Sequence, residues 1–455
     1  MYDPKQDRFV FIAMYGYWDL DTSIYTLGTL TAFSKSNDPI DGWNFYYFPD
    51  SLLNDGSTVD YPQLGMTNDE AFVTMLRFDQ DGNLTHSLIL QEDKNAGYAG
   101  ASTITSQIFN VPLTGITLGS VVPASGGSTT YGPKMYFMMA DETGNEADSF
   151  FVLEVSNTIA SGSAILKTYG AFHSNLDYLP AGFSKQPGNL YLTDVNAEYD
   201  DFVMSAFYEN GLIQFCQNTN VNGKAGIYLG RISRSPAATI VTAQTIGYSN
   251  LFLSFPSIAY AGKGMGDNSL IMNVPYTGKH IFPGTASIYM NSNFKTSPLK
   301  LVKAGNDTIN SYWGDYSGIC RRYNNPGECW LIGQYGSTTP LSINWIAQLF
   351  NPDLQFRNLN ESVESKSIVQ VFPNPFSQST TISFTLSQAE KISLNIYDLS
   401  GRVVKVLADE IINTGKHELE WNSTDQNGNI EPAGIYLLRM QTGNENETIR
   451  LSVVK

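Results

Sequence analysis

A strand–turn–strand pattern recurs along most of this chain at intervals of about 60 residues, and it restricts the fold more than any other feature. Each copy has a short strand, a turn rich in Asp, Asn and Gly, and a stronger apolar strand, as in "YDPKQDRFVFIAMYG". Most copies continue with a third strand such as "SIYTLGTLTAF" and a more irregular fourth such as "WNFYYFP". The copies begin at residues 2, 61, 131, 192, 255 and 312. Four strands per unit without a helical period predict an all-β, six-bladed β-propeller over residues 1–357, with seven blades as the alternative.

The last repeat is shorter than the others. After "CWLIGQYGS" it has "INWIAQLF" at 343–350 and then a polar stretch, so no fourth strand follows. Because a ring of blades closes with a strand from the other terminus, we expect the closing strand upstream of Met1, together with a signal peptide. The propeller would then be N-terminally truncated. We also expect the edge of 343–350 to be unpaired and to expose Trp345 and Phe350.

Composition and charge exclude several classes of protein. Aromatic residues make up 13% of the chain and charged residues only 15%, with a net charge of −16. An acidic surface repels phosphate backbones, so we expect no nucleic-acid partner. No apolar run is long enough for a transmembrane segment. The acidic balance is typical of a chain that stays soluble in an extracellular medium.

The cysteines fit an oxidising compartment. Cys320 and Cys329 flank "RRYNNPGE", whose Asn-Asn-Pro-Gly sequence is typical of a turn. Folding the chain about Asn324 and Asn325 places the two cysteines opposite each other, which predicts a cross-strand disulfide. The alternative is two reduced, half-buried thiols. Cys216 lies in an apolar strand and is expected to be inert core.

The repeats resemble bacterial repeat-type, sialidase-like propellers. "SNDPIDGWNFY" at 36–46 is similar to the Asp-box turn of that group, which is structural and not catalytic. The resemblance implies, for an active sialidase, three converging arginines, a Tyr–Glu pair and an acidic proton donor. The propeller region has few arginines to build such a triad, and it has neither a His-Glu-x-x-His helix nor a Gly-x-Ser-x-Gly elbow. No catalytic residues can therefore be assigned from the sequence.

Three aspartates stand at the starts of predicted inner strands: Asp60, Asp194 and Asp315. The first strand of each propeller blade lines the axial channel, so these carboxylates are candidates for a polar ligand or a Ca²⁺ ion. The competing interpretation is that each one caps its strand by accepting hydrogen bonds from nearby backbone N–H groups. No cofactor and no metal site is assigned beyond this calcium hypothesis. The segment "FDQDGN" at 78–83 has alternating acids but is more typical of a hairpin turn.

The sequence pattern changes after a polar linker at 358–367. Short strands of period two follow in "TISFTL", "ISLNIYDL", "RVVKVL", "HELEW", "GIYLLRM" and "ETIRLSVV". Six or seven short strands with one apolar face predict a compact, immunoglobulin-like β-sandwich over residues 368–455. The expected core residues are Leu394, Ile396, Trp421, Tyr436 and Leu438.

The tail resembles the type A C-terminal sorting domain of the type IX secretion system of Bacteroidetes. The matching elements are the Pro-Asn-Pro entry, "YDLSGR" at 397–402, a later glycine, "AGIYLLR" at 433–439 and the final strand. Ala433 stands where serine is common in that family. The residues taken as the sorting signal are Pro373, Asn374, Pro375, Gly401, Arg402, Gly415, Gly434, Tyr436 and Lys455.

The resemblance implies delivery to the outer cell surface or the medium. The folded sandwich would be recognised by the outer-membrane translocon and then removed by a sortase-like protease, and the linker 358–367 is the expected cleavage stretch. The propeller would then be an exported cargo. The leading hypothesis is a surface or secreted module that binds a glycan or protein ligand. The alternative is a sialidase-like glycoside hydrolase or lyase that uses carboxylates of the channel.

Overall fold

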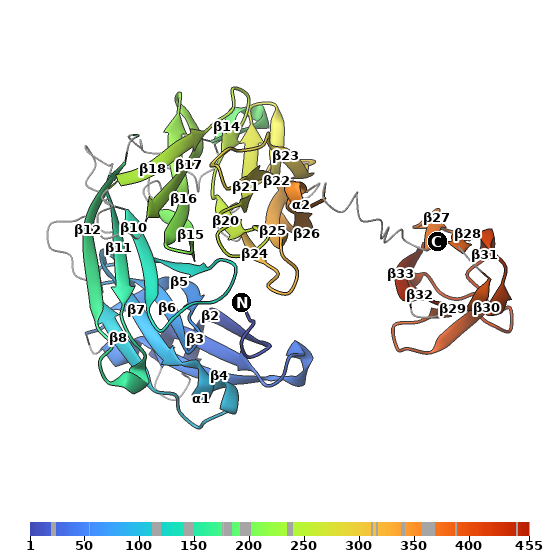
Figure 1. The fold of residues 1–455 in the computed structure, drawn as a ribbon, viewed down its shortest axis with the longest axis horizontal. Helices are drawn as coiled ribbons and strands as arrows, with labels where there is room; N and C mark the ends of the chain where they lie inside the picture. The colour runs from blue at the N-terminus through green and yellow to red at the C-terminus, as the bar shows by residue number, and fades with distance from the viewer. Residues whose placement is uncertain are drawn as a thin grey trace. The chain divides into compact units, whose positions relative to one another are not determined.

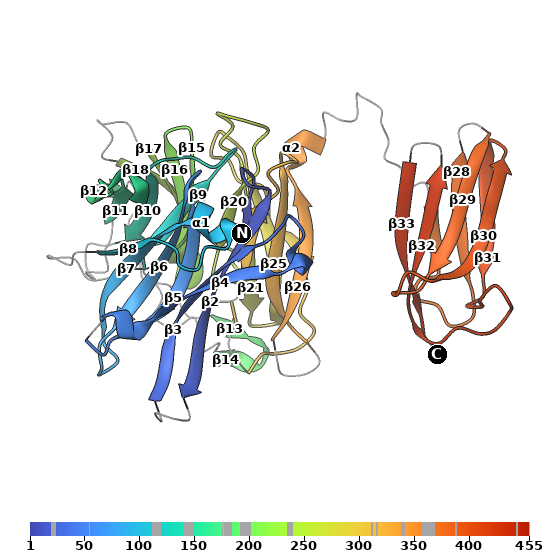
Figure 2. The same ribbon diagram turned by 90° about the horizontal axis from the view of Figure 1, so that it is seen from below.

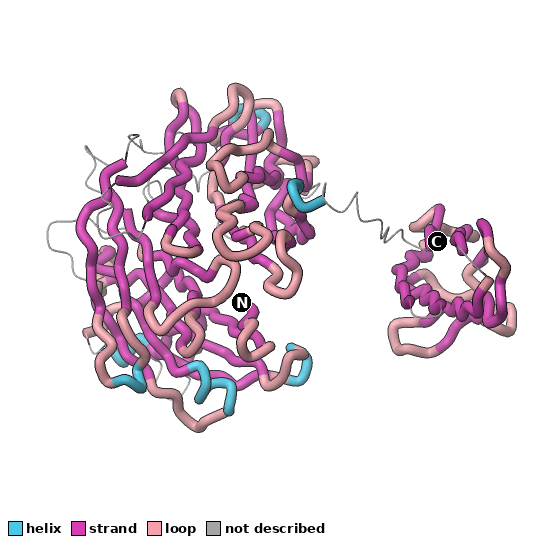
Figure 3. Tube along the Cα trace, in the orientation of Figure 1, coloured by secondary structure: helices cyan, strands magenta, loops and turns pink. Residues whose placement is uncertain are grey.

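The computed structural model places the chain in two compact units, Met1–Arg357 and Asn358–Lys455. The described residues are 1–19, 24–53, 55–111, 120–140, 149–174, 176, 184–191, 202–233, 240–310, 313–314, 317–337, 342–355, 369–386, 389–442 and 445–454. Figure 3 shows that both units consist mostly of strands, with a few short helices. The linker 358–367 lies outside the described residues.

The first unit begins with two four-stranded antiparallel sheets. Sheet 1 contains β1 (Tyr2–Asp3), β2 (Arg8–Asp19), β3 (Ile24–Ser34) and β4 (Trp43–Pro49). Sheet 2 contains β5 (Thr58–Met66), β6 (Glu70–Phe78), β7 (Leu84–Asp93) and β8 (Ser106–Asn110). The short helices beside them are η1 (Pro39–Asp41), η2 (Asp50–Leu53) and α1 (Lys94–Ala99). In both sheets each strand pairs with its neighbour in sequence, as expected for propeller blades.

Sheets 3 and 4 pair with each other through parallel strands. Sheet 3 contains β9 (Val122–Gly126), β10 (Met135–Ala140), β11 (Ser149–Val155) and β12 (Leu166–Ser174). Sheet 4 contains β15 (Val203–Glu209), β16 (Leu212–Val221), β17 (Lys224–Ser233) and β18 (Ile240–Ile246). Strand β9 runs parallel to β15 and β12 runs parallel to β18, which closes the two sheets into a barrel. Helix η3 (Ile159–Ser161) connects β11 to β12 within sheet 3, and β13 (Lys185–Gln186), η4 (Pro187–Asn189) and β14 (Leu190–Tyr191) lie between the two sheets in sequence.

Two further sheets complete the described part of the first unit. Sheet 5 contains β19 (Phe252–Leu253), β20 (Ser257–Tyr260), β21 (Leu270–Gly278), β22 (Ile281–Met290) and β23 (Lys300–Lys303). Sheet 6 contains β24 (Gly318–Arg321), β25 (Glu328–Gly336) and β26 (Ser342–Phe350), and helix α2 (Pro352–Gln355) follows. The sheets surround a common axis, with β5, β15, β20 and β24 nearest to it (Figure 1). The first unit is therefore a propeller-type arrangement, while the choice between six and seven blades stays a prediction.

The middle strands of two sheets are buried on both faces. Every residue of β21 is buried, and so are eight of the nine residues of β6. Their sequences, LIMNVPYTG and EAFVTMLRF, accordingly do not alternate between apolar and polar residues. A buried ion pair joins sheets 1 and 2, since Lys94 Nζ lies 2.6 Å from Asp3 Oδ2 and 2.7 Å from the carbonyl of Thr67.

In the described part of the chain, one edge of sheet 6 is unpaired. Within the described residues β26 pairs with β25 alone, and the sheet has three strands. Trp345 and Phe350 are 40% and 44% exposed, as the sequence analysis expected. Ile346, on the same strand, is 65% exposed.

The predicted Cys320–Cys329 disulfide is wrong. Both cysteines are free thiols, and Cys320 pairs with Trp330 while Cys329 pairs with Arg321. The turn is one residue longer than the sequence analysis assumed, because Gly327 adopts a φ of +83° and the turn closes between Arg322 and Glu328. A register shift of one residue places the two sulfurs on opposite faces of the sheet. Cys216 is fully buried in the core, as predicted.

The second unit is a β-sandwich. One sheet contains β27 (Val369–Phe372), β28 (Thr380–Leu386) and β31 (Gly415–Trp421). The other contains β29 (Glu390–Tyr397), β30 (Val403–Ile412), β32 (Gly434–Thr442) and β33 (Glu445–Val453), in the order β30-β29-β32-β33. Figure 2 shows its strands from the side. All five predicted core residues are buried, with exposures of 4% or less, and they belong to one apolar cluster.

Candidate functional site

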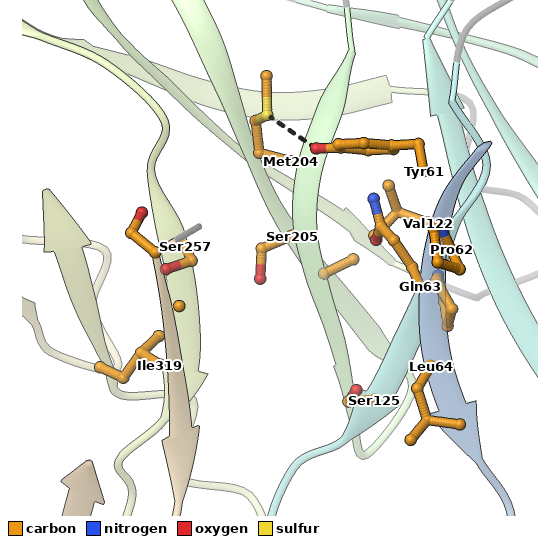
Figure 4. Close-up of a pocket in the computed structure, with 14 residues that line it drawn as sticks. Tyr61, Pro62, Gln63, Leu64, Val122, Ser125, Met204, Ser205, Ser257 and Ile319 are labelled. Atoms are coloured by element: carbon orange, nitrogen blue, oxygen red, sulfur yellow. Dashed lines mark hydrogen bonds between the residues drawn. The ribbon is translucent and has the colours of Figure 1, made fainter. Parts of the chain in front are cut away.

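A cavity of about 330 Å³ lies where the innermost strands of five sheets meet. Fourteen residues line it, and they come from β5, β9, β15 and β20 and from the start of β24 (Figure 4). This volume falls within the range of about 300–1,000 Å³ that is typical of ligand pockets. The described lining residues carry no formal charge and combine hydroxyl, amide and aromatic groups with aliphatic ones. The axial cavity is therefore the candidate site of the first unit.

Tyr61 forms one wall of the axial cavity because of an irregularity in β5. The register of β5 against β6 shifts between Asp60 and Gln63, and Tyr61 has a φ of +55°. A bulge of this kind redirects a side chain, and a positive φ at a bulky residue is uncommon enough to mark a constrained position. The Tyr61 hydroxyl on β5 lies 3.9 Å from the sulfur of Met204 on β15 (Figure 4).

Four serines line the axial cavity: Ser125, Ser205, Ser257 and Ser317. The Oγ of Ser205 accepts a hydrogen bond from the backbone N–H of Ile258 at 3.2 Å and lies 3.3 Å from its carbonyl oxygen, so it joins β15 to β20. Ser257 Oγ and Ser317 Oγ are buried and have no hydrogen-bond partner among the described residues. Buried hydroxyls are almost always paired, so these two need an explanation.

The aspartates predicted to line the channel do not form a described site. Asp60 is exposed and does not line the axial cavity; its Oδ1 accepts a hydrogen bond from the backbone N–H of Tyr61 at 2.6 Å. This is the strand-capping role that the sequence analysis held as the competing interpretation. Asp194 and Asp315 lie outside the described residues. Among the residues that the structure describes, no group of three His, Cys, Asp or Glu side chains could hold a metal ion, and the calcium site stays a hypothesis.

The described arginines of the first unit are used separately in local structure. Arg77 pairs with Asp55, and Arg322 lies 3.1 Å from a carboxylate oxygen of Glu328. Arg231 donates to the Oε1 of Gln214 at 2.7 Å, and burial lowers its pKa to about 10. Each guanidinium thus has its own structural partner, as is usual for partly buried charges.

Arg321 and Glu209 lie at the carboxyl ends of the inner strands β24 and β15. The Arg321 guanidinium lies 4.9 Å from the ring centre of Tyr260 and 4.4 Å from that of Tyr323, and burial lowers its pKa. The Glu209 carboxylate accepts hydrogen bonds from the backbone N–H of Ser128, at 2.6 Å, and from that of Gly266, at 3.2 Å. These contacts hold the loops of sheets 3 and 5 together, and sequence analysis missed them because the partners are far apart in the chain.

The Pro-Asn-Pro segment of the second unit binds the last strand. The side chain of Asn374 donates to the carbonyl of Arg450 at 2.7 Å and accepts from the N–H of Ser452 at 2.9 Å. Phe376 continues this contact: its backbone N–H donates to the carbonyl of Ser452 in β33, and its carbonyl accepts from the N–H of Val454 just after the strand. Pro373 and Pro375, each after a cis peptide bond, have no N–H to donate. The segment therefore covers part of the edge of β33.

The other sorting-signal residues support turns and a surface network. Asp398 accepts hydrogen bonds from the N–H of Ser400 and from the Nε of Arg402, whose second contact is Glu431 at 3.2 Å. Tyr436 donates to the carbonyl of Pro432 at 2.8 Å. Three glycines complete the motif: two with positive φ, Gly401 at +85° and Gly415 at +121°, and one in strand β32, Gly434. Lys455 lies outside the described residues.

Comparisons with known proteins agree with the account of the second unit. Residues 370–455 match the family described as the secretion system C-terminal sorting domain. A search of the curated proteins found no match.

Three solved structures similar to the chain were compared. PorZ of Porphyromonas gingivalis, a surface component of the type IX secretion system, is 11% identical to this chain with a TM-score of 0.30. The matched region covers 98% of this chain and 58% of the PorZ chain. The endosialidase of phage phi92 is 11% identical with a TM-score of 0.33, covering 98% and 87%. The β-propeller domain of the trilobed protease of Pyrococcus furiosus is 11% identical with a TM-score of 0.32, covering 86% and 94%. All three scores lie below 0.5, so none of them bears on what this chain does.

The localisation of this protein follows from its sorting domain. Within the described residues no helix has the length and apolar character that a membrane span requires. The match, the Pro-Asn-Pro contact with β33 and the Asp398–Arg402 turn all lie in the same 86 residues. Residues 370–455 are a C-terminal sorting domain of the type IX secretion system, and the protein is a secreted or cell-surface cargo of that system.

Proposed function

We propose that this protein is an exported binding module whose propeller unit holds an extracellular glycan or protein ligand. The observation that carries the proposal is the axial cavity, whose described lining combines neutral polar side chains, the ring of Tyr61 and apolar side chains from five sheets. Because the strands beneath it are paired and buried, these side chains are held in place before a ligand arrives. A pre-arranged site of this kind suits recognition.

The sorting domain directs the export of the propeller unit. We propose that the outer-membrane translocon recognises the folded sandwich and that a sortase-like protease then separates it from the propeller within 358–367. The exposed Arg402, which Asp398 and Glu431 hold in place, is part of the surface that such a receptor would meet. The prediction is that removing residues 368–455 leaves the propeller in the periplasm of the native host, whereas the variant Asp81→Asn, on an exposed turn of the first unit, is exported normally. Full export of the truncated chain would refute this assignment.

Binding and catalysis can be separated in one experiment. The purified full chain is applied to an array of glycans and extracellular proteins, and the same glycans are analysed for cleavage after incubation. The proposal predicts retention of a ligand without release of shorter products. Turnover of a glycan would instead support the glycoside hydrolase or lyase, the alternative that the sequence left open.

A further inference from the structure

The buried pair of Lys94 and Asp3 lies outside the axial cavity and has no part in the proposed binding function. Both side chains are fully buried, and Lys94 Nζ lies 2.6 Å from Asp3 Oδ2. Asp3 ends β1 and Lys94 begins α1, 91 positions further along the chain. Removing two opposite charges from water is costly, and their mutual attraction does not always offset that cost. An amine and a carboxyl group this close together can also lose their charges by condensing to an amide.

Burial distinguishes this pair from another short lysine–carboxylate contact. Lys416 Nζ lies 2.7 Å from Glu418 Oε1, but both of these side chains are more than half exposed, so water keeps them charged. Burial instead lowers the pKa of Lys94, because the charged amine loses its hydration, although Asp3 opposes this shift. Proton transfer from Nζ to the carboxylate then leaves a neutral amine beside a neutral carboxyl group. These are the protonation states from which an amide forms, since only a neutral amine has a free electron pair.

The two carboxyl oxygens of Asp3 have different partners. Oδ1 accepts a hydrogen bond from the backbone N–H of Lys5 at 3.0 Å, and this donor would stabilise negative charge on Oδ1 during attack at the carboxyl carbon. Oδ2 accepts a hydrogen bond from the Tyr98 hydroxyl at 3.2 Å. Burial raises the pKa of Tyr98, so its hydroxyl keeps its proton and is available as a donor. The contacts therefore favour Oδ1 as the oxygen that stays and Oδ2 as the one that leaves.

The surrounding structure holds the reacting groups in place. Lys94 Nζ also donates to the carbonyl oxygen of Thr67 at 2.7 Å, and Asp93 caps the first turn of α1 by accepting from two backbone N–H groups. The ring of Tyr98 packs against Phe33, with 5.2 Å between the ring centres. Groups fixed in contact react as if they were present at a very high concentration, so no external catalyst is required to bring them together.

We propose that Lys94 and Asp3 form an intramolecular isopeptide bond in the folded first unit. The neutral Nζ attacks Cγ of the protonated Asp3 carboxyl group, and a bond forms between Nζ and Cγ. Tyr98 gives its proton to the Oδ2 hydroxyl and takes one from Nζ, and the bond between Cγ and Oδ2 breaks. One water molecule leaves and a neutral amide remains. The reaction uses no oxidant, cofactor or second protein.

The bond gives this exported chain a covalent cross-link that its cysteines do not supply. All three cysteines, Cys216, Cys320 and Cys329, are free thiols. The isopeptide bond joins β1, which has only two residues, to the helix that follows the third strand of sheet 2. Closing a long loop restricts the unfolded chain, so the cross-link stabilises the contact between sheets 1 and 2.

The test is the mass of the folded full chain, measured by mass spectrometry after denaturation. We expect the parent to be lighter than its sequence mass by one water molecule. A tryptic digest should contain the peptide with Asp3 joined to a peptide in which Lys94 is not cleaved. The variant Lys94→Met should have its full sequence mass, whereas the matched control Lys416→Met should keep the water loss. Tyr98→Phe keeps both reacting groups and should form the bond at least about tenfold more slowly.

Three outcomes would overturn the proposal. The first is a parent chain that keeps its full sequence mass after prolonged incubation in the folded state, as a purely ionic contact requires. The second is a water loss that persists in Lys94→Met, as a succinimide at another aspartate would give. The third is a joined peptide that links residues other than Asp3 and Lys94. The parent mass decides the matter even if Lys94→Met does not fold, and the result is independent of the glycan array.

Discussion

Replacing Glu92 by glutamine should stabilise the propeller unit at neutral and alkaline pH. Glu92 lies on β7, is 4% exposed, and interacts with Thr31 of the neighbouring sheet 1. Its Oε2 is buried without a hydrogen-bond partner among the described residues. Burial raises the pKa of Glu92 from 4.5 to about 7, because the charged form loses its hydration between the two sheets.

The size of the effect follows from that shift. The folded protein binds the proton more tightly than the unfolded chain, so the neutral carboxyl contributes stability that is fully present below pH 4.5 and is lost as the pH rises through about 7. The difference between the two pKa values corresponds to about 3 kcal/mol at most in the free energy of unfolding. Glutamine has nearly the same shape as glutamate but does not ionise. The variant Glu92→Gln should therefore equal the parent chain near pH 4.5 and exceed it by up to about 3 kcal/mol at pH 8.

The measurement is the free energy of unfolding in urea, followed for the full chain at pH 4.5, 6 and 8. Burial also raises the pKa of Glu70 to about 7, but Glu70 is present in both proteins. The difference in unfolding free energy between variant and parent therefore reports on Glu92 alone. Asp81→Asn, on an exposed turn, is the matched control and should give the same small difference at every pH. The reasoning fails if the difference between Glu92→Gln and the parent does not grow between pH 4.5 and pH 8.

Two further predictions concern backbone and packing. Gly415→Ala should destabilise the sandwich by about 1 kcal/mol because alanine is disfavoured at a φ of +121°, although nothing lies within 4 Å of the new methyl group. Gly434→Ala, with no positive φ and its nearest neighbour at 3.9 Å, should have little effect; equal melting temperatures for the two variants would contradict the argument. Arg231→Met should lower the free energy of unfolding by about 2 kcal/mol, since it leaves the Oε1 of Gln214 without its donor and removes a cation 4.3 Å from the ring centre of Phe294. An unchanged urea midpoint for Arg231→Met would show that these contacts carry no net stability.

Several features of the candidate site could not be read from the sequence. Serines are common on exposed turns, so nothing in the sequence shows that the hydroxyl oxygens of Ser257 and Ser317 are buried without a partner among the described residues. The positive φ of Tyr61 depends on a bulge whose position is set by pairing with β6. Asp60, which the sequence pattern singled out as a channel carboxylate, instead accepts a hydrogen bond from the backbone of its own strand. Residues far apart in the chain define the cavity, and a local pattern contains no information about which of them meet.

The sequence by itself determined the repeated strands, the change to a sandwich after the linker, and the sorting domain. These are properties of period-two patterns, turn residues and a contiguous motif, all of which act between residues close together in the chain. Only the tertiary structure decided how the inner strands of five sheets enclose a cavity, and which face of sheet 6 each cysteine occupies. It also decided that Glu92 is buried between two sheets. The physical reason is that register and burial depend on contacts between distant segments, where a shift of one residue moves a side chain to the opposite face of its sheet.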